Sequence, residues 1–192
     1  MLYTRRGDDG TTKTFSAGPG ERITKSSPRA EALGSMDEIN SFLGSCKVEA
    51  RKWNYSLELK GKKRRKVLLA DVAHEVQGNL FIVQAELAGA DKKITANKVT
   101  KIENYIDSIE KELPPIKTFF ISGGTELASR FDVARTLARR AERRVVLLHE
   151  SGEKKVSKQT RKYMNRLSSL LYALARYSNY IYGIDEKAPD YT

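Results

Sequence analysis

The sequence contains very few of the residues that most often carry covalent or metal chemistry. It has one cysteine and two histidines among 192 residues. A lone Cys46 excludes a disulfide within the chain and is typical of a reducing compartment. Because Cys46 falls inside a helical pattern with no activating base nearby, inert packing explains it better than nucleophilic catalysis.

Membrane and secretion signals are also missing from the sequence. No apolar run reaches the length that a membrane span needs, and the first residues do not form an apolar signal segment. We therefore expect a cytoplasmic protein that makes no membrane contact.

Two common patterns for binding metals and nucleotides do not occur. The histidines are His74 and His149, and Asp71-x-x-His74 is a single instance of its kind. A two-metal carboxylate site in a helical bundle needs a pair of Glu-x-x-His motifs. No Gly-x-x-x-x-Gly-Lys-Ser/Thr sequence is present, which excludes a P-loop nucleotide site.

Positive charge, in contrast, is abundant. The chain has 35 lysines and arginines against 24 acidic residues, a net charge of +11. This excess favours an anionic partner such as a nucleotide or nucleic acid, although a charge-rich solvated surface would also produce it. The run Lys60–Lys66 leaves open a basic helical module that binds nucleic acid, but no aromatic residues alternate with its charges as in a single-strand platform.

The pattern of apolar residues predicts an all-α protein, a five-helix up-and-down bundle with an extended N-terminal arm. Ser27-Pro28 is a good helix start, although Ser35 and Glu38 match a capping box that would start the first helix later. The expected helices span about 28–53, 63–90, 95–113, 125–149 and 154–182. The expected units are a nucleotide-binding arm (1–26), the bundle (27–183) and a flexible tail (184–192), together forming a single domain.

The arm contains an unusual stretch, Thr4–Thr12, with two arginines, two glycines and three threonines in nine residues. Glycine allows backbone N–H groups to approach a ligand closely, and arginine supplies a fork of donors. This composition favours a phosphate-rich ligand.

The expected helix 125–149 carries a ridge of charged side chains. Asp132, Arg135, Arg139, Glu142 and Arg143 recur at spacings of three and four, which places them on one face. Such a ridge can be a self-paired surface stripe, or a polyphosphate clamp in which each arginine fork binds two oxygens.

Two other helices carry polar faces. The first includes Asp37 and Asn40 beside its apolar stripe, which suggests the close approach of a ligand or another chain. The last places Asn165, Ser169 and Arg176 on one face, a pattern that ordinary amphipathicity would also produce.

Taken together, these segments resemble one family, the trimeric type of ATP-dependent cobalamin adenosyltransferase. The matching segments occur in the family's order and cover nearly the whole chain. They are Thr4–Thr12, Arg22–Lys25, Gly34–Ser41, Phe119–Gly124, Arg139–Arg144 and Asn165–Ser168.

The resemblance implies a homotrimer of five-helix bundles with ATP bound between subunits. It implies transfer of the 5′-deoxyadenosyl group of ATP to Co(I) of a reduced corrinoid, giving adenosylcobalamin and triphosphate. Mg²⁺ would bind through the triphosphate and not in a protein cage. An electron-donating reductase and an adenosylcobalamin-dependent enzyme are the implied partners, and no nucleic acid is expected.

The resemblance also implies roles for individual residues. Asp37 and Arg135 would meet across the subunit interface beside the reaction centre, Arg139 would act in catalysis, and Phe119 would block the lower axial position of the corrinoid. The implied ATP-binding residues are Thr4, Arg5, Arg6, Gly7, Thr12, Lys25, Arg139, Arg140, Glu142, Arg143 and Asn165.

The sequence departs from the family pattern at two positions. Ser122 stands where the family usually has proline before its paired glycines, and Ser169 stands where aspartate often follows Asn-Arg-Leu-Ser. A third function therefore stays open, that of a noncatalytic helical bundle that senses ATP without turning over a corrinoid.

Overall fold

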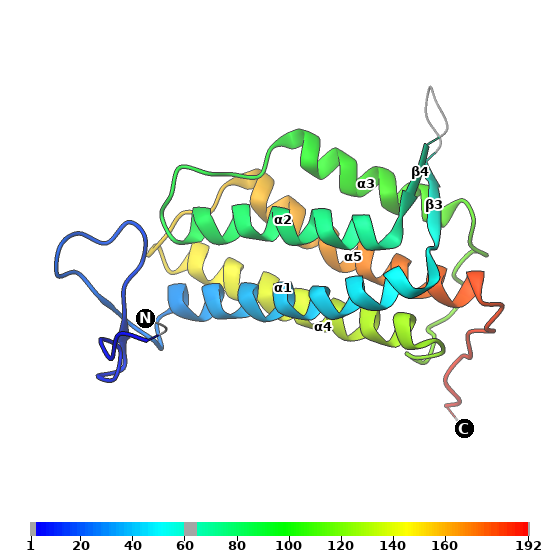
Figure 1. Ribbon diagram of the computed structural model, residues 1–192, viewed down its shortest axis with the longest axis horizontal. Coiled ribbons are helices and arrows are strands. Elements are labelled where there is room, and N and C mark those ends of the chain that lie inside the picture. The colour runs from blue at the N-terminus through cyan, green and yellow to red at the C-terminus, as the bar shows by residue number, and fades with distance from the viewer. Residues whose placement is uncertain (1–2, 60–64, 192) are drawn as a thin grey trace.

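Five helices build the protein, as the computed structural model shows for residues 3–59 and 65–191 (Figure 1). Consecutive helices run in opposite directions, and the arm and the C-terminal segment lie at opposite ends of the bundle (Figure 1). The predicted all-α bundle with its extended arm is confirmed. The helices are α1 (Pro28–Trp53), α2 (Leu69–Leu87), α3 (Ala96–Glu110), α4 (Glu126–Glu150) and α5 (Lys158–Ile181).

The first helix begins where the Ser27-Pro28 signal predicts. The Ser27 hydroxyl accepts a hydrogen bond from the amide of Ala30 at 3.2 Å, and proline occupies the first turn. The alternative start at Ser35 is therefore wrong. The helix ends at Asn54, whose φ of 53° is left-handed, a conformation that asparagine tolerates better than most residues.

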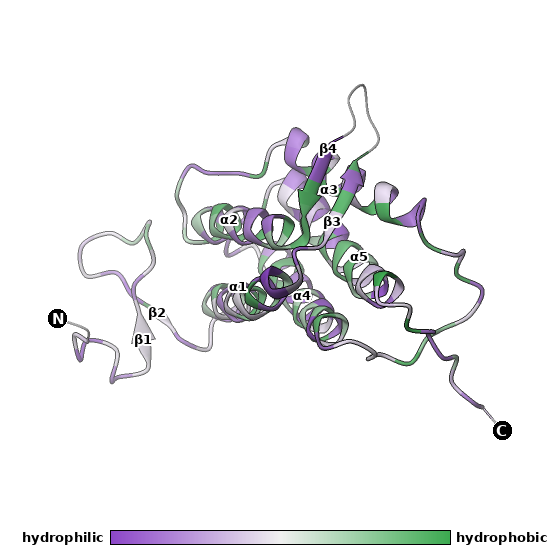
Figure 2. Cartoon of the chain, turned by 45° about the vertical axis from the view of Figure 1, so that its right-hand side comes forward, coloured by the Kyte–Doolittle hydropathy of each residue, from purple (hydrophilic) through white to green (hydrophobic). Residues whose placement is uncertain are grey.

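The predicted apolar stripes form the core between the helices. α4 packs against both α1 and α5, α2 packs on α1, and α3 packs on α5. Hydrophobic residues gather where these helices face one another, while polar residues lie outside (Figure 2). No helix in the described part of the chain is both long and apolar enough to cross a membrane.

The start predicted for the second helix is wrong, and so is the expectation of no strands. Strands β3 (Ser56–Leu59) and β4 (Arg65–Leu68) form an antiparallel hairpin, and α2 begins only at Leu69. Leu57 is fully buried and pairs with Val67 across the hairpin, so packing outweighs the helix propensity of the neighbouring lysines and arginines. Most of the basic run, residues 60–64, lies outside the described residues.

The arm is folded back on itself and attached to the bundle. Its strands β1 (Thr11–Thr12) and β2 (Ile23–Thr24) pair antiparallel. Arg29 of α1 donates to the Ser16 hydroxyl at 2.8 Å and to the carbonyl of Leu87 at 2.8 Å. The base of the arm is therefore fixed at the ends of α1 and α2, while its Thr4–Thr12 turn is left exposed for the most part.

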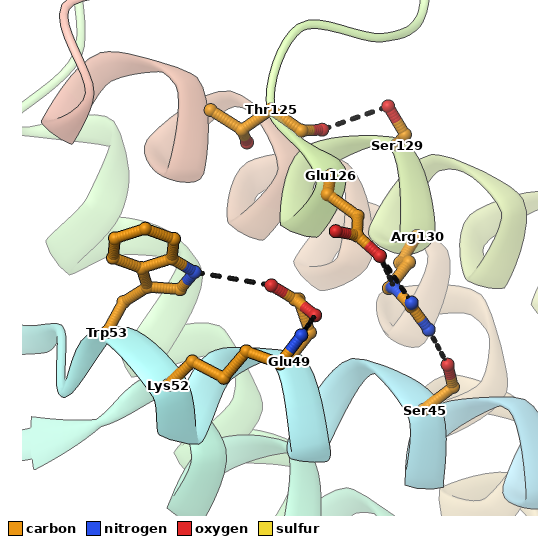
Figure 3. Close-up of polar contacts among 8 residues, drawn as sticks. All are labelled: Ser45, Glu49, Lys52, Trp53, Thr125, Glu126, Ser129 and Arg130. Carbon is orange, nitrogen blue, oxygen red and sulfur yellow. Dashed lines mark hydrogen bonds and ion pairs between the residues drawn. The ribbon is translucent and has the colours of Figure 1, made fainter.

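A polar cluster joins the other ends of α1 and α4 (Figure 3). Arg130 of α4 donates to Ser45 of α1 and to Glu126, 2.5 Å away. The buried Glu49 accepts hydrogen bonds from Lys52 at 2.7 Å and from the Trp53 indole at 3.2 Å. Because the buried Glu49 carboxylate has partners, the cluster fixes the two helix ends without an uncompensated buried charge.

Candidate active site

The charged ridge of α4 faces the start of α5 and the loop that precedes α4. Arg135 lies 3.4 Å from Asp132 and packs over the Tyr172 ring, with 5.9 Å between its guanidinium carbon and the ring centroid. Burial raises the pKa of the Tyr172 phenol above its ordinary value. The contacts with Asp132 and Tyr172 hold the Arg135 guanidinium beside the aromatic ring.

A large cavity lies between this ridge and loop 114–124. It measures about 620 Å³, and Arg135, Arg139 and Tyr172 line one side. Phe119, with 80% of its surface exposed, lies on the loop side. A volume of this size lies within the usual range of small-molecule binding sites.

A second cavity, of about 360 Å³, continues along α4 toward its C-terminus. Its polar lining includes Arg139, Glu142, Arg143 and Asn165. The Asn165 amide donates to the Glu142 carboxylate at 3.0 Å, which joins α5 to α4. Arg139 lines both cavities, so this residue lies between them.

A third cavity, of about 490 Å³, lies on the α1 side of α4 near the arm. Lys25 and Arg140 line it, and Arg140 forms an ion pair with Glu38 of α1. Arg140 therefore faces away from its neighbour Arg139. The structure brings Arg139, Glu142, Arg143 and Asn165 together, but it places Arg140 with Lys25 in a different cavity.

Lys25 and Arg22 hold the turn of the arm in shape. The Lys25 ammonium donates to the carbonyl of Gly7 at 2.7 Å, and Arg22 donates to the carbonyls of Arg6 and Thr11 at 2.5 and 3.0 Å. A Cβ on Gly7 would lie 3.1 Å from the Thr11 carbonyl oxygen, closer than side chains normally approach. A side chain at this position would therefore require its neighbours to shift by a few tenths of an ångström.

Most of the remaining predicted residues are exposed. Thr4, Arg5 and Arg6 are exposed on the arm, Thr12 is half-buried in β1, and Asp37 is exposed on α1. Within one chain Arg135 pairs with Asp132 and not with Asp37. One chain therefore carries two separate groups of candidate residues, one on the arm side and one on the α4–α5 side.

Sequence reasoning missed several residues of this region. Arg22 belongs to the matching segment Arg22–Lys25, and this membership could have identified it as a residue that shapes the arm. Arg176 was assigned to a polar face of α5, yet it is only 6% exposed. Asn179 is also buried, but it follows Arg176-Tyr177-Ser178 in a largely polar segment, so nothing in the sequence marks it as a residue of the site.

Among the described residues, no group of three or more His, Cys, Asp or Glu side chains could hold a metal ion.

Comparison with known proteins agrees with this arrangement. A family model described as cobalamin adenosyltransferase matches residues 2–178. The chain therefore belongs to the cobalamin adenosyltransferase family, as the resemblance predicted.

Individual relatives support the same assignment. The corrinoid adenosyltransferase PduO of Citrobacter freundii is 40% identical over 182 residues, which are 91% of this chain and 49% of that protein. This chain thus spans about half the length of that relative. A corrinoid adenosyltransferase of Bacillus subtilis is 37% identical over 96% of this chain and 90% of its own length.

Solved structures share the fold over the full chain. A variant of the PduO-type ATP:corrinoid adenosyltransferase from Lactobacillus reuteri, complexed with cobalamin and ATP, matches with a TM-score of 0.81. It is 31% identical, and the match covers 98% of this chain and 99% of that one.

Proposed function

We propose that this protein transfers the 5′-deoxyadenosyl group of ATP to Co(I) of a reduced corrinoid, releasing triphosphate. The observation that carries the proposal is the position of Arg139, which lines both the large cavity beside Phe119 and the polar cavity beside Asn165. The first cavity would hold the corrinoid and the second the nucleotide.

The chemistry needs no nucleophile from the protein. The cobalt electron pair attacks C5′ of ATP, the C5′–O bond breaks, and its electrons leave with triphosphate. Arg139 and Arg143 would stabilise the charge that grows on the leaving group, with Glu142 and Asn165 fixing their positions. Mg²⁺ bound to the triphosphate would supply further positive charge.

Phe119 would cover the lower face of the corrinoid. Its exposed ring lies at a cavity that has no described histidine in its lining. An apolar surface there excludes water and an axial ligand, which makes reduction to Co(I) easier. Ser122 and Ser169, the two departures from the family pattern, lie in the same lining and bear on corrinoid binding more than on ATP.

A complete site would need two subunits. The arm residues, Lys25 and Arg140 lie on one side of the chain, and the Arg139 group lies on the other. We infer a homotrimer in which the arm of one subunit covers the triphosphate held by α4 of the next. Asp37 would then meet Arg135 of the neighbouring subunit. Sedimentation of the purified protein tests the trimer.

We further infer that the protein works in the cytoplasm with a reductase that supplies the electron and an enzyme that uses adenosylcobalamin. The lone, buried Cys46 is consistent with a reducing compartment.

The experiment is an anaerobic assay with ATP, Mg²⁺ and chemically reduced cobalamin, followed by the absorbance of adenosylcobalamin. We expect product from the wild type and slower turnover for Phe119→Ala, with ATP affinity unchanged. Phe81→Ala is the matched control, because Phe81 is also an exposed phenylalanine but lies on α2. If the wild type forms no product, the proposed function is wrong.

A further inference from the structure

Loop 114–124, which carries Phe119, is hydrogen-bonded at both ends to side chains from the last turns of α5. The loop has neither helix nor strand of its own, so its position depends on contacts from elsewhere. Two buried polar side chains of α5, Arg176 and Asn179, supply these contacts, and each is 6% exposed.

Asn179 holds the end of the loop. Its amide nitrogen donates to the carbonyl of Gly123 at 2.9 Å, and its amide oxygen accepts from the backbone N–H of Thr125 at 3.0 Å. Thr125 in turn caps α4 by accepting from the amide of Ala128 at 3.1 Å. The loop end, α5 and the start of α4 are therefore joined through one side chain.

Arg176 holds the beginning of the loop. Its guanidinium lies 5.0 Å from the centroid of the Phe120 ring and donates to the carbonyl of Pro114 at 3.4 Å. The ring next to Phe119 in the chain is thus packed on a buried charge. That charge needs a partner, because an unpaired guanidinium in this position would be strongly unfavourable.

The partner comes from the C-terminal segment. Arg176 donates to the carboxylate of Glu186 at 2.7 Å, with the two side chains 7% and 16% exposed. One residue later, the carbonyl of Lys187 accepts from the backbone N–H of Ile121 at 2.9 Å, and Ile184 donates to the Asn179 carbonyl at 3.0 Å. Residues 184–187, expected from the sequence to belong to a flexible tail, thus run along the loop and bind it directly.

We propose that Arg176, Asn179 and Glu186 are positioning residues, and that the C-terminal segment 184–187 is a strap that sets where Phe119 stands over the corrinoid. This inference rests on the proposed function, and it concerns the same cavity. The strap acts on the corrinoid side, because its described contacts, to Arg176, Asn179 and Ile121, lie away from the cavity lined by Arg143 and Asn165. Loosening it should weaken corrinoid use and leave ATP binding intact.

The test compares Glu186→Gln with the wild type. Glutamine keeps the shape and one hydrogen-bond acceptor but removes the charge that neutralises Arg176. We expect the KM for the reduced corrinoid to rise at least about fivefold, with the KM for ATP within twofold of the wild type. Glu186→Asp should recover part of the loss. Glu153→Gln, at an exposed position between α4 and α5, is the matched control.

Two readouts separate positioning from a general loss of structure. With cob(II)alamin and ATP bound, electron paramagnetic resonance should show a smaller fraction of cobalt without an axial ligand in Glu186→Gln. Hydrogen exchange of the peptide 116–122 should also become faster, while exchange in α1 stays unchanged. This exchange measurement needs no activity.

The outcomes distinguish the two proposals. A wild type without turnover overturns the proposed function, and the exchange result then decides the strap on its own. A wild type that turns over, together with a Glu186→Gln variant whose corrinoid KM and loop exchange are unchanged, overturns the strap.

Discussion

The paired glycines before α4 allow a quantitative test of the contact between Asn179 and loop 114–124. Gly123 and Gly124 have φ values of +130° and +101°, conformations that residues with a side chain rarely adopt. A Cβ on Gly124 would lie 2.3 Å from the Asn179 amide oxygen, whereas a Cβ on Gly123 would meet nothing within 4 Å. Alanine at either position would therefore strain the backbone, but only alanine at position 124 would also clash with the Asn179 side chain.

The expected magnitudes follow from this difference. Alanine at either position should cost about 2 kcal/mol of unfolding free energy through backbone strain. Gly124→Ala must also displace the Asn179 side chain, which breaks its hydrogen bonds to Gly123 and Thr125. At about 1 kcal/mol for each bond, this adds roughly 2 kcal/mol.

Urea denaturation of both variants measures the difference. We expect Gly124→Ala to be less stable than Gly123→Ala by about 2 kcal/mol. The same comparison in an Asn179→Ala background should remove the difference, because the clash partner is gone. Equal stability of the two single variants, or an unchanged difference without the Asn179 side chain, would refute the reasoning.

Three further predictions address the site, the arm and the polar cluster. Arg139→Ala should lower the rate of adenosylcobalamin formation by about 100-fold or more, since a fixed charge at the leaving group is lost, while Arg51→Ala at an exposed site should not. Trypsin should cleave within residues 3–26 in free protein and more slowly with ATP bound, because the arm would order over the triphosphate. Hydrogen bonding to Lys52 lowers the pKa of Glu49 below its ordinary value of 4.5. The contribution of Glu49 to the free energy of unfolding is therefore present above pH 4.5 and is lost as the pH falls below it. In urea denaturation at a series of pH values, the free energy of unfolding of Glu49→Gln should fall less steeply on the acid side than that of the wild type.

Each of these has an outcome that counts against it. Normal turnover in Arg139→Ala would show that Arg139 does not stabilise the leaving group. Cleavage of the arm at the same rate with and without ATP would argue against its closing. If the free energy of unfolding of Glu49→Gln falls with pH as steeply as that of the wild type, other carboxylates dominate the acid sensitivity of the fold.

The bundle could be predicted from the sequence because its signals are local. The Ser27-Pro28 start and the stripe Ala32, Met36, Ile39 and Leu43, all fully buried, need only one helix to be recognised. The ridge containing Arg139 and Arg143 was visible for the same reason. Their spacing fixes a shared face before any tertiary contact is known.

The hairpin and the loop contacts could not be predicted in this way. Leu57 is buried because a strand carries it into the core, and the only local sign was an alternation of two leucines in Leu57-Glu58-Leu59. Asn179 and Gly124 meet across 55 positions of the chain, and Arg176 finds its partner in a segment expected to fray. Such contacts depend on how helices pack, which periodicity within one helix does not reveal.

The most direct test of the central claim is a count of products in a single turnover. Wild-type protein with ATP, Mg²⁺ and Co(I) cobalamin should give one triphosphate for each adenosylcobalamin, measured by phosphorus NMR and absorbance, and neither product without Co(I). Release of diphosphate and phosphate without adenosylcobalamin, or tight ATP binding with no product, would contradict the account.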